Sequence, residues 1–591
     1  MSQKNWIYKN EKESLKKAAL SLSESAGISM MAATLCVNRG LNTSDEVKVF
    51  LNPRLDQLTH PFKILDLEKA AKRIFKSQLS ATPEKIRVFT DYDVDGTSGA
   101  ALLTWFFRDL KFNFSVKQPD RFKDGYGLNV SAVDEAHADG VKILITVDCG
   151  ITNFDAAKRA QELGIELIIV DHHLIDPVHG VPPAFAVIDP HRSDDTSGLK
   201  MLCGCALGFY LCLGIRSMAR DAKYFETRAA DGVVEPNMKS LLDLVVIATA
   251  ADMVPLTGDN RILVKHGLDV LKDTQKPGLK ALCDQAGFAT KTMNASSLGF
   301  SIGPRINASG RMGSAETALK VLTSKDPVES HHLAQELELI NKQRMELQNQ
   351  IWDEVREKVN KGIEDGKYSH AVVVASANWH EGVVGIVAAK VTEHFKRPAI
   401  ILAIREDGIA KGSVRSYAGY NVLEALHLTK DFLVGYGGHK YAAGLSLAEG
   451  ELEKFVLAYN EAVGSLTPSR NGETFELEGK FELKDFTPKA IEEIEKFAPY
   501  GTGNPEPLFA VAAYVDQQNI LKGRHVKLKL GPPKSLEGIW FNAAERLEIT
   551  ELLEKSAQLR EVCLFAGIPE LNRYMGRVTP TLRIKAAINI Q

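Results

Sequence analysis

Carboxylate and imidazole side chains recur in short clusters along the first half of this chain. They form Asp91-Tyr92-Asp93-Val94-Asp95-Gly96, Val147-Asp148-Cys149-Gly150, Asp171-His172-His173 and Ala251-Asp252-Met253. Carboxylates suit Mg²⁺ and Mn²⁺ as ligands, and the presence of imidazole favours Mn²⁺. Two such ions about 3.5–4 Å apart supply an activated water and neutralise phosphate charge, as phosphodiester hydrolysis requires. The residue types therefore predict a site for divalent cations.

The first cluster also fits the opening of an EF-hand calcium loop. Such a loop begins Asp-x-Asp-x-Asp-Gly and needs a bidentate glutamate at its twelfth position. Counting from Asp91, the twelfth residue is Leu102. The cluster also follows a strand-like run and not a helix. We therefore expect no calcium loop here.

The first three clusters each follow a short apolar run that is rich in Ile and Val. The runs are 86–89, 141–147 and 165–170. Runs of this kind are typical of buried parallel strands. In an open α/β sheet, ligands bind beyond the carboxyl ends of the strands, so the clusters are expected to share one rim. Taken alone, Asp148 could equally cap a helix, and His172 and His173 could be surface residues.

Later segments combine small residues with phosphate-binding side chains. Gly303 to Arg311 reads GPRINASGR and is expected to form a loop that brings Arg305, Asn307 and Arg311 to phosphate oxygens. The alternative is an ordinary turn that pairs an arginine with a local carboxylate. The same chemistry recurs in Gly412-Ser413-Val414-Arg415-Ser416 and in Gly437-Gly438-His439.

Changes of pattern along the chain predict several domains. Alternating strands and helices from about 85 to 325 indicate a parallel sheet, and short strands dominate after about 468. A charged stretch between them reads as one long helix that bridges two α/β lobes, with the working cleft between the lobes. The predicted parts are an N-terminal helical segment (1–80), a catalytic domain (81–326), the connecting helix (327–362), a second α/β domain (363–466) and an OB-fold-like barrel (467–591).

The final block carries basic residues together with aromatic ones. Val526 to Leu530 alternates with period two, which puts Lys527 and Lys529 on one face. With Arg524 close by, these residues suit a single-stranded nucleic acid. The alternative is that the lysines only protect a strand edge from aggregation.

Composition is that of an ordinary globular protein. The chain has 591 residues, 45% of them hydrophobic, and a formal net charge of -3, so no global basic field indicates nucleic acid. Cys203-Gly204-Cys205 is the tightest cysteine pair, but a zinc site there would need a second ligand pair. The N-terminus has no apolar signal-like region, and no apolar run approaches the roughly 20 residues of a membrane helix. We expect a cytoplasmic monomer without membrane contact.

The ordered motifs resemble the DHH phosphoesterase superfamily, which is named for the sequence present here as Asp171-His172-His173. Within it the chain is similar to the RecJ family of bacterial single-strand-specific exonucleases, from about Ala33 to the C-terminus. The similarity rests on DYDVDGTSG (91–99), GPRINASGR (303–311), WHEGVVGI (379–386), GSVRS (412–416) and GGHKYAAG (437–444).

This resemblance implies a parallel-sheet DHH domain, a long connecting helix, a DHH-associated α/β domain and an OB-fold-like barrel. It also implies two divalent cations, Mn²⁺ or Mg²⁺, with Asp148 bridging them. The implied ligands are Asp93, Asp95, Asp148, His172 and Asp252. Asp91 would orient its neighbours from behind the ligands, and His173 would act with Asp148 in catalysis by contacting phosphate. Related pyrophosphatases have a histidine where this chain has Phe89, so the first ion is expected to be held more weakly or more openly.

The implied activity is 5′-to-3′ hydrolysis of single-stranded DNA to 5′-mononucleotides in recombination and repair. The expected substrate contacts are Arg305, Asn307, Arg311, Ser413, Arg415, Ser416, Gly438, His439, Arg524, Lys527 and Lys529. Arg344 in the long helix is interpreted as a solvated surface charge, with a contact to the same substrate path as the alternative. The implied partners are single-strand-binding protein and a RecQ-type helicase.

Two other functions stay open at this point. A DHH phosphodiesterase for short oligonucleotides or cyclic dinucleotides usually lacks the final barrel. A non-catalytic single-strand-binding scaffold usually loses metal ligands, which this chain retains. The sequence does not distinguish DNA from RNA.

Overall fold

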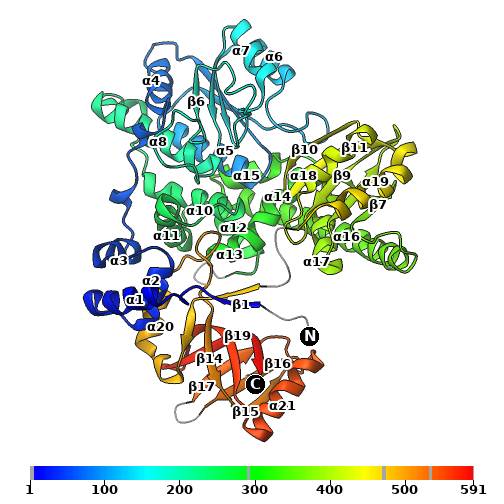
Figure 1. Ribbon diagram of the computed structural model, residues 1–591. Helices are drawn as coiled ribbons and strands as arrows, with labels where there is room; N and C mark the ends of the chain where they lie inside the picture. Colours follow the sequence, from blue (N-terminus) through cyan, green and yellow to red (C-terminus); the bar gives the residue numbers. More distant parts are fainter. Residues whose placement is uncertain (1–4, 289–292, 469–473, 532–534, 590–591) are drawn as a thin grey trace. The chain divides into compact units, whose positions relative to one another are not determined.

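The computed structural model describes residues 5–288, 293–468, 474–531 and 535–589 (Figure 1). Contacts group the chain into two compact units. One consists of Met1–Leu58, Pro255–Lys265 and Glu473–Gln591, and the other of Thr59–Val254 and His266–Gly472. The five domain segments predicted from the sequence do not correspond one to one with these two units, and their boundaries stay predictions.

A five-stranded sheet organises the first α/β domain of the larger unit. Its strands are β2 (Lys85–Thr90), β3 (Phe114–Lys117), β4 (Val141–Val147), β5 (Glu166–Val170) and β6 (Ala186–Ile188). The order is β3-β2-β4-β5-β6, and every pairing is parallel. From β2 the chain continues to β3, which pairs with one edge of β2, and the next strand in the sequence, β4, pairs with the opposite edge of β2. The carboxyl ends of β2 and β4 therefore flank a topological switch point, where α/β sheets bind ligands.

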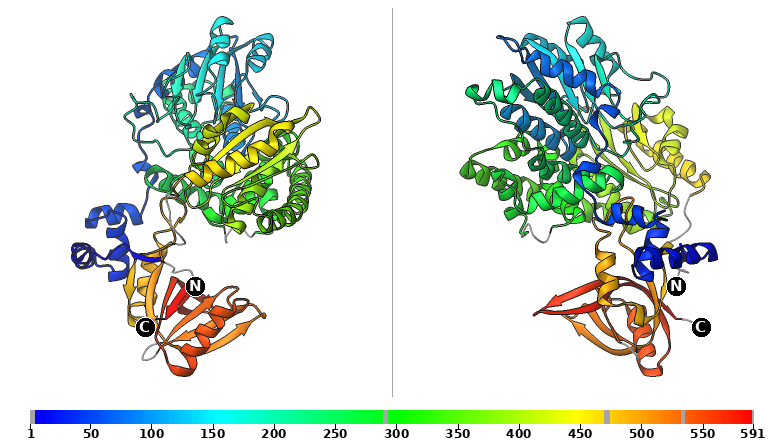
Figure 2. Two further views of the ribbon diagram at one scale, coloured as in Figure 1. Left: turned by 45° about the vertical axis from the view of Figure 1, so that its right-hand side comes forward. Right: turned by 90° about the vertical axis from the view of Figure 1, so that its left-hand side faces the viewer.

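Helices cover both faces of this sheet, as can be followed in Figure 2. Apolar residues of α6 (Val130–Ala138) and α7 (Phe154–Glu162) pack on one face, and α5 (Val94–Asp109) and α8 (Gly204–Asp221) contact the strands from the other. The other helices of this region are α4 (Leu67–Ser77), α9 (Tyr224–Thr227), α10 (Leu242–Ala251), α12 (Pro277–Gln285), α13 (Ala295–Ser297) and α15 (Glu316–Thr323). Helix α11 (Gly258–Lys272) is divided between the two units after Lys265.

The segment expected to be a Gly- and Ser-rich loop is a helix. A short π-helix, Leu298–Ile302, leads directly into α14 (Gly303–Met312). Pro304 stands in the first turn, where its missing N–H has no cost. Gly310 lies against the Tyr92 backbone, and a Cβ added at this position would be only 3.1 Å from the Tyr92 carbonyl oxygen. Close packing outweighs the poor helix propensity of glycine, so the loop prediction was wrong.

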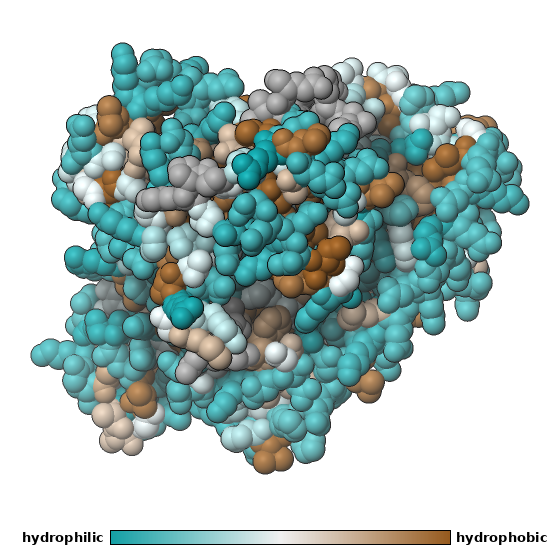
Figure 3. All heavy atoms as spheres, turned by 90° about the horizontal axis from the view of Figure 1, so that it is seen from below, coloured by the Kyte–Doolittle hydropathy of each residue, from teal (hydrophilic) through white to brown (hydrophobic). Residues whose placement is uncertain are grey.

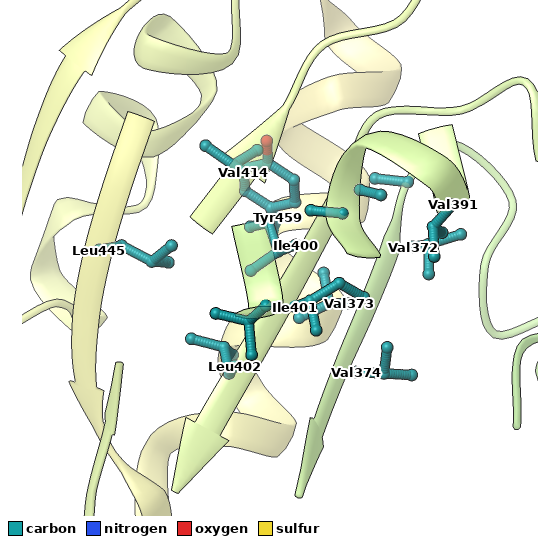
Figure 4. Close-up of a cluster of buried hydrophobic side chains, with 14 of the residues drawn as sticks. Val372, Val373, Val374, Val391, Ile400, Ile401, Leu402, Val414, Leu445 and Tyr459 are labelled. Carbon is teal, nitrogen blue, oxygen red and sulfur yellow. The ribbon is translucent and has the colours of Figure 1, made fainter. Parts of the chain in front are cut away.

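The long helix predicted from the charged stretch is α16 (Pro327–Glu364), which leads into the second α/β domain. Its strands are β7 (Val372–Ser376), β8 (Ala399–Ile404), β9 (Ile409–Arg415), β10 (Gly435–His439) and β11 (Ala442–Ala448), in the order β10-β11-β9-β8-β7. Its helices are α17 (Glu381–Phe395), α18 (Val422–Leu428) and α19 (Leu452–Ser465). Figure 4 shows the aliphatic core of this domain, where Val372–Val374 and Ile400–Leu402 lie beside Tyr459.

The smaller unit joins N-terminal helices to a β-rich block through one apolar core. The N-terminal helices are α1 (Glu13–Ala26), α2 (Met30–Asn38) and α3 (Ser44–Leu51), and the β-rich block adds α20 (Pro488–Glu495) and α21 (Leu547–Leu559). The seven-stranded sheet has the order β13-β14-β18-β19-β17-β16-β15. Its strands are β13 (Gly479–Phe481), β14 (Phe509–Ala513), β15 (Val515–Leu521), β16 (His525–Leu530), β17 (Leu536–Trp540), β18 (Cys563–Tyr574) and β19 (Arg577–Asn589).

Two details of this unit differ from the sequence prediction. β1 (Asn5–Tyr8) pairs in parallel with β12 (Thr474–Leu477), so the N-terminal segment is not wholly helical. β15 was not predicted, because its exposed polar residues 516–519 carry no apolar alternation. Both strands gain their stability from pairing with a partner strand and not from local pattern.

The surface drawn in Figure 3 is mostly hydrophilic, and its apolar residues are interspersed among polar ones. Among the described residues, no single helix is long and apolar enough to cross a membrane. One sharply bent pair, Glu13–Ala26 with Met30–Asn38, meets the criterion only when the two helices are taken together.

Candidate metal centre and substrate pocket

The turn between β2 and α5 brings several carboxylates of the first cluster together. Asp93 is the N-cap of α5, and its Oδ1 accepts hydrogen bonds from the N–H groups of Asp95 at 2.8 Å and Gly96 at 3.1 Å. Gly96 lies tightly over Asp91, since a Cβ at this position would be 2.4 Å from the Asp91 carbonyl oxygen. Asp91 and Asp95 are both buried. The turn therefore holds three acids at the carboxyl end of β2.

Asp148 occupies the carboxyl end of the neighbouring strand β4. Its backbone is left-handed, with φ 62°, a conformation that few residues other than glycine, asparagine and aspartate adopt without strain. Its Oδ1 lies 3.1 Å from Nε2 of His172, which follows β5. Asp148 does not cap α7, whose N-cap is Asn153. The alternative interpretation of Asp148 as a helix cap is therefore wrong.

These side chains form three groups in which the potential ligand atoms all lie within 4.8 Å of one another. The groups are Asp91, Asp93 and Asp148; Asp95, His172 and Asp252; and Asp148, His172 and His173. Asp252 is the C-cap residue of α10. The geometry thus brings together every residue predicted to hold metal.

The chemistry of this cluster fits cations. Asp91 Oδ1 and Asp252 Oδ2 are buried and have no hydrogen-bond partner among the described residues. Burial together with the Asp93 charge raises the pKa of Asp91 to about 8, and burial together with the Asp95 charge raises the pKa of Asp252 to about 8. Burial and neighbouring acids also raise the pKa of Asp148. Buried like charges of this kind require a counter-charge, which divalent cations would supply.

Asp91 lies as close to the cluster as Asp93 does. The sequence suggested that Asp91 orients its neighbours from behind the ligands, but its carboxylate belongs to one of the three groups. Phe89, where the related pyrophosphatases have a histidine, is buried in strand β2. Asp91 thus shares a potential metal-binding group with Asp93 and Asp148.

His173 projects from the rim of the same cluster. Its Nδ1 lies 2.7 Å from Asp171 Oδ1, and its Nε2 lies 3.4 Å from the hydroxyl of Tyr126. Burial disfavours the charged ring, but the hydrogen bond to Asp171 outweighs it and raises the pKa of His173 to about 9. Asp171 also accepts hydrogen bonds from the N–H groups of Ile151 and His172, which fixes the loop after β5. The half-exposed His173 ring is thus held by Asp171 at the mouth of the site, in surroundings that favour its protonated form.

A pocket of about 240 Å³ lies between the two α/β domains of the larger unit. Tyr92, Arg121, Phe122 and Tyr126 line it from the first domain, and Glu381, Lys411 and Ser413 line it from the second. The Arg121 guanidinium stacks over the Tyr92 ring at 5.4 Å, and the Phe122 ring contacts that of His380. Sequence reasoning missed Arg121 and Tyr126, although both follow the end of β3 in a basic and aromatic segment. That position at the end of a strand was the available signal.

Several arginines converge beside this pocket. Burial, followed by the charges of Arg121 and Arg344, lowers the pKa of Arg311 to about 10, and Arg415 is close enough to contribute. Arg311 donates to the Gly382 carbonyl and Arg415 to that of Val414. Neither is in an ion pair with a carboxylate among the described residues. Such a cluster attracts a phosphate.

Arg344 and Arg305 differ in their surroundings. Arg344 is buried and hydrogen-bonds Asn341 and Gln348 along α16, so its interpretation as a solvated surface charge was wrong. Arg305 pairs with Glu338 at 2.7 Å. The sequence left open an ordinary turn with a local carboxylate partner, but this segment is a helix and Glu338 lies 33 residues away on α16. A substrate role for Arg305 stays only a prediction.

The remaining predicted substrate residues have specific structural places. Asn307 Oδ1 accepts from Val94 N–H at 3.1 Å, so it helps to hold the start of α5. Ser413 and Arg415 lie on β9 against Gly385, where a Cβ would be 3.1 Å from the Ser413 hydroxyl. Ser416 donates to the Tyr420 carbonyl. His439 is exposed on β10, and Gly438 beside it has φ 141° and no room for a Cβ against Ala443.

The basic residues of the β-rich block lie in the smaller unit. Lys527 pairs with Glu537 at 3.1 Å, and Lys529 lies 3.6 Å from Asp516. Arg524 is exposed near the turn between β15 and β16, next to His525, whose ring meets that of Phe541 edge to face. The lysines therefore have carboxylate partners on neighbouring strands.

Fold and site together define a DHH-type phosphoesterase with an added barrel domain. Residues 85–249 match the family model for the DHH family, N-terminal domain, and residues 365–465 match that for the DHHA1 domain. Residues 477–586 match the RecJ OB domain.

The chain belongs to the RecJ family. The single-stranded-DNA-specific exonuclease RecJ of Bacillus subtilis is 34% identical over 573 residues, which cover 96% of this chain and 69% of that protein. The Escherichia coli protein of the same name is 34% identical over 522 residues, covering 86% and 88%. The crystal structure of RecJ from Thermus thermophilus in complex with Mn²⁺ matches with a TM-score of 0.80 and 26% identity, covering 100% of this chain and 80% of that one. The predicted family and fold class are confirmed.

Proposed function

We propose that this chain hydrolyses single-stranded DNA from a 5′ end, releases 5′-mononucleotides and uses Mn²⁺ or Mg²⁺. The observation that carries the proposal is the cluster of acids and imidazoles at the switch point of the sheet, beside a pocket lined by cationic side chains. Relatives that are named single-stranded-DNA-specific exonucleases support the substrate. Solved RecJ structures in complex with Mn²⁺ and with Mg²⁺ support the metals.

Two cations in this cluster would supply a nucleophilic water and neutralise charge at the phosphorus. Asp91, Asp93 and Asp148 would hold one, and Asp95, His172 and Asp252 the other, with Asp148 between the two. Each of the three measured groups offers ligand atoms within 4.8 Å of one another, which suits this assignment. The assignment differs from the sequence prediction only in making Asp91 a direct ligand.

The chain's own residues would place the scissile phosphate. His173, cationic and held by Asp171, would donate a hydrogen bond from Nε2 to a phosphoryl oxygen. Arg121, Arg311 and Arg415 would contact the neighbouring phosphate from the pocket side. The stacked pair of Tyr92 and Arg121 offers a flat surface to a base. The pocket of about 240 Å³ would take only part of a strand, which supports a single-stranded substrate.

Two alternatives are less well supported. A phosphodiesterase for short oligonucleotides or cyclic dinucleotides would not need the block that matches the RecJ OB domain over residues 477–586. A binding scaffold without catalysis would not need to keep the complete set of clustered ligands. The cytoplasmic monomer, expected from composition, and the partners implied by the family resemblance, single-strand-binding protein and a RecQ-type helicase, stay predictions.

The deciding experiment is a nuclease assay on matched substrates with Mn²⁺ or EDTA. We expect hydrolysis of a linear single strand labelled at its 5′ end, with a mononucleotide as the first labelled product. A circular single strand and a blunt duplex of the same sequence should be resistant. Cleavage of the circle at a similar rate would refute the exonuclease proposal. Binding without any hydrolysis would favour the scaffold.

A further inference from the structure

The Cys203-Gly204-Cys205 turn, the tightest cysteine pair in the sequence, begins helix α8. Cys203, Cys205 and Cys212 are all buried free thiols. None of them belongs to a potential metal-binding group among the described residues. The structure thus gives no support to a zinc site, and the backbone of this turn makes the informative contacts.

Two successive N–H groups of this turn bind one carboxylate. Gly204 N–H donates to Asp95 Oδ2 at 2.6 Å, and Cys205 N–H donates to Asp95 Oδ1 at 2.8 Å. The first N–H groups of a helix have no partner within the helix, and its N-terminus carries partial positive charge. Asp95 has only 1% of its surface exposed. The start of α8 therefore compensates a buried charge that belongs to a different helix, α5.

The same turn also fixes the other side of the site. A Cβ on Gly204 would lie 2.8 Å from the Asp148 Cβ and 2.9 Å from its Cα and N. The Cys203 sulfur lies 3.7 Å from the hydroxyl of Thr249, on the helix that ends at Asp252. Segments that carry three of the proposed ligands thus meet at one turn.

We propose that the start of α8, with Gly204 at its centre, is a positioning element for the metal centre. Because both Asp95 oxygens accept an N–H, the carboxylate cannot rotate, and Oδ2 is held 3.7 Å from His172 Nε2. Because Gly204 has no side chain, Asp148 can approach Asp95. The turn acts through these two ligands and contacts neither substrate nor cation. The inference rests on the proposed function only in taking this cluster to be the cation site.

The first test compares two glycines of the same helix. Gly204→Ala introduces a Cβ into Asp148, whereas a Cβ on Gly208 meets nothing within 4 Å. Mn²⁺ affinity of the full chain is measured by calorimetry after EDTA treatment, and folding by circular dichroism. Changes behind metal ligands typically cost about 10- to 100-fold in affinity, and we expect Gly204→Ala to fall in that range while Gly208→Ala matches the wild type. A folded Gly204→Ala protein with wild-type affinity would overturn the proposal.

A second measurement does not depend on the Gly204→Ala variant. In the wild-type chain labelled with ¹⁵N-cysteine, the Cys205 amide is assigned by its loss in Cys205→Ala. We expect this amide resonance to shift in a saturable way on adding Mg²⁺, in step with Mg²⁺ binding measured by calorimetry. Saturation by Mg²⁺ without such a shift would overturn the proposal. A wild-type protein that binds Mn²⁺ but cuts no single strand would instead refute the proposed function and leave this inference intact.

Discussion

His172 Nε2 lies 3.1 Å from Asp148 Oδ1, across the carboxyl ends of the neighbouring strands β5 and β4. Two of the three potential metal-binding groups share Asp148, and two share His172. Asp148 and His172 therefore each belong to two of the potential metal-binding groups. A change at either position should affect the whole centre and not a single ligand contact.

Asp148→Asn should separate activity from stability. Asparagine keeps the shape and tolerates the φ of 62°, but it loses the charge that would hold both cations. We expect hydrolysis to fall about 100-fold or more, about 2.7 kcal/mol in the barrier. In EDTA the variant should resist urea better than the wild type, because a buried charge among like charges has been removed. Retention of more than about a tenth of the activity, 1.4 kcal/mol, would contradict the bridging role.

Removal of metal should lower the stability of the wild type. A ligand that binds only the folded state at about 100 times its Kd adds about 2.7 kcal/mol to the free energy of unfolding. Mn²⁺ should therefore raise the melting temperature relative to EDTA. The increase should be much smaller in Asp148→Asn, which serves as the matched control. Equal increases in both proteins would place the stabilising ions elsewhere.

Arg415→Ala should weaken substrate binding without weakening metal binding. The Arg415 side chain donates to a backbone carbonyl and has no carboxylate partner among the residues described, so its charge is available to phosphate. A charged hydrogen bond contributes about 1.5–3 kcal/mol, so we expect a rise in KM of roughly 10- to 100-fold for a 5′-phosphorylated strand. Arg397→Ala is the control, because it removes another arginine of the second α/β domain that donates to backbone carbonyls, among them that of Ser369. A parallel loss of Mn²⁺ affinity would remove Arg415 from the substrate role.

Tyr126→Phe tests the contact at the mouth of the site. The hydroxyl of Tyr126 lies 3.3 Å from the Asp148 carbonyl and 3.4 Å from His173 Nε2. Phenylalanine keeps the ring that packs on His173 and removes only these hydrogen bonds. We expect kcat to fall by roughly threefold to tenfold, the equivalent of one net hydrogen bond of about 1 kcal/mol. Tyr126→Ala should cost more than Tyr126→Phe, and equal kinetics for Tyr126→Phe and the wild type would exclude a role for the hydroxyl.

The barrel residues should not contribute equally to binding. Each neutralised phosphate contributes about −0.7 to the slope of log affinity against log salt on a single strand. Lys527 and Lys529 have carboxylate partners, so replacing both by alanine should leave this slope nearly unchanged. Replacing the exposed Lys522 and Arg524 should flatten it by roughly 1.4. Affinity for a long single strand, measured in EDTA over a salt series, distinguishes the two pairs, and the opposite ranking would restore the strand lysines as the binding surface.

The sequence predicted the sheet of the first domain well because its strands carry their own signal. Val141–Val147 and Glu166–Val170 contain the continuous apolar runs Ile143–Ile145 and Leu167–Val170, whose burial can be read from residue type alone. Polar residues directly after such strands must lie at the switch point, so the grouping of Asp93, Asp148 and His172 could also be anticipated.

The rest of the site depended on contacts between distant segments. Gly303 to Arg311 reads as a loop by composition and is a helix because Gly310 packs on Tyr92. The hydrogen bonds from Gly204 and Cys205 to Asp95 join residues more than a hundred positions apart, and no local pattern marks them. The pairing of Arg305 with Glu338 likewise depends on the course of α16.

Helix α16 also determines how the larger unit can come apart. Its first half buries Ala334, Leu337 and Arg344 beside α14, and its second half places Val355 and Val359 in the core of the second α/β domain. One unbroken helix of 38 residues is thus a structural member of both cores. Melting either core would leave an apolar stripe of the same helix in water, so the free energies of the two domains are coupled. The two α/β domains should therefore unfold in one cooperative transition, and neither should survive as a separate proteolytic fragment.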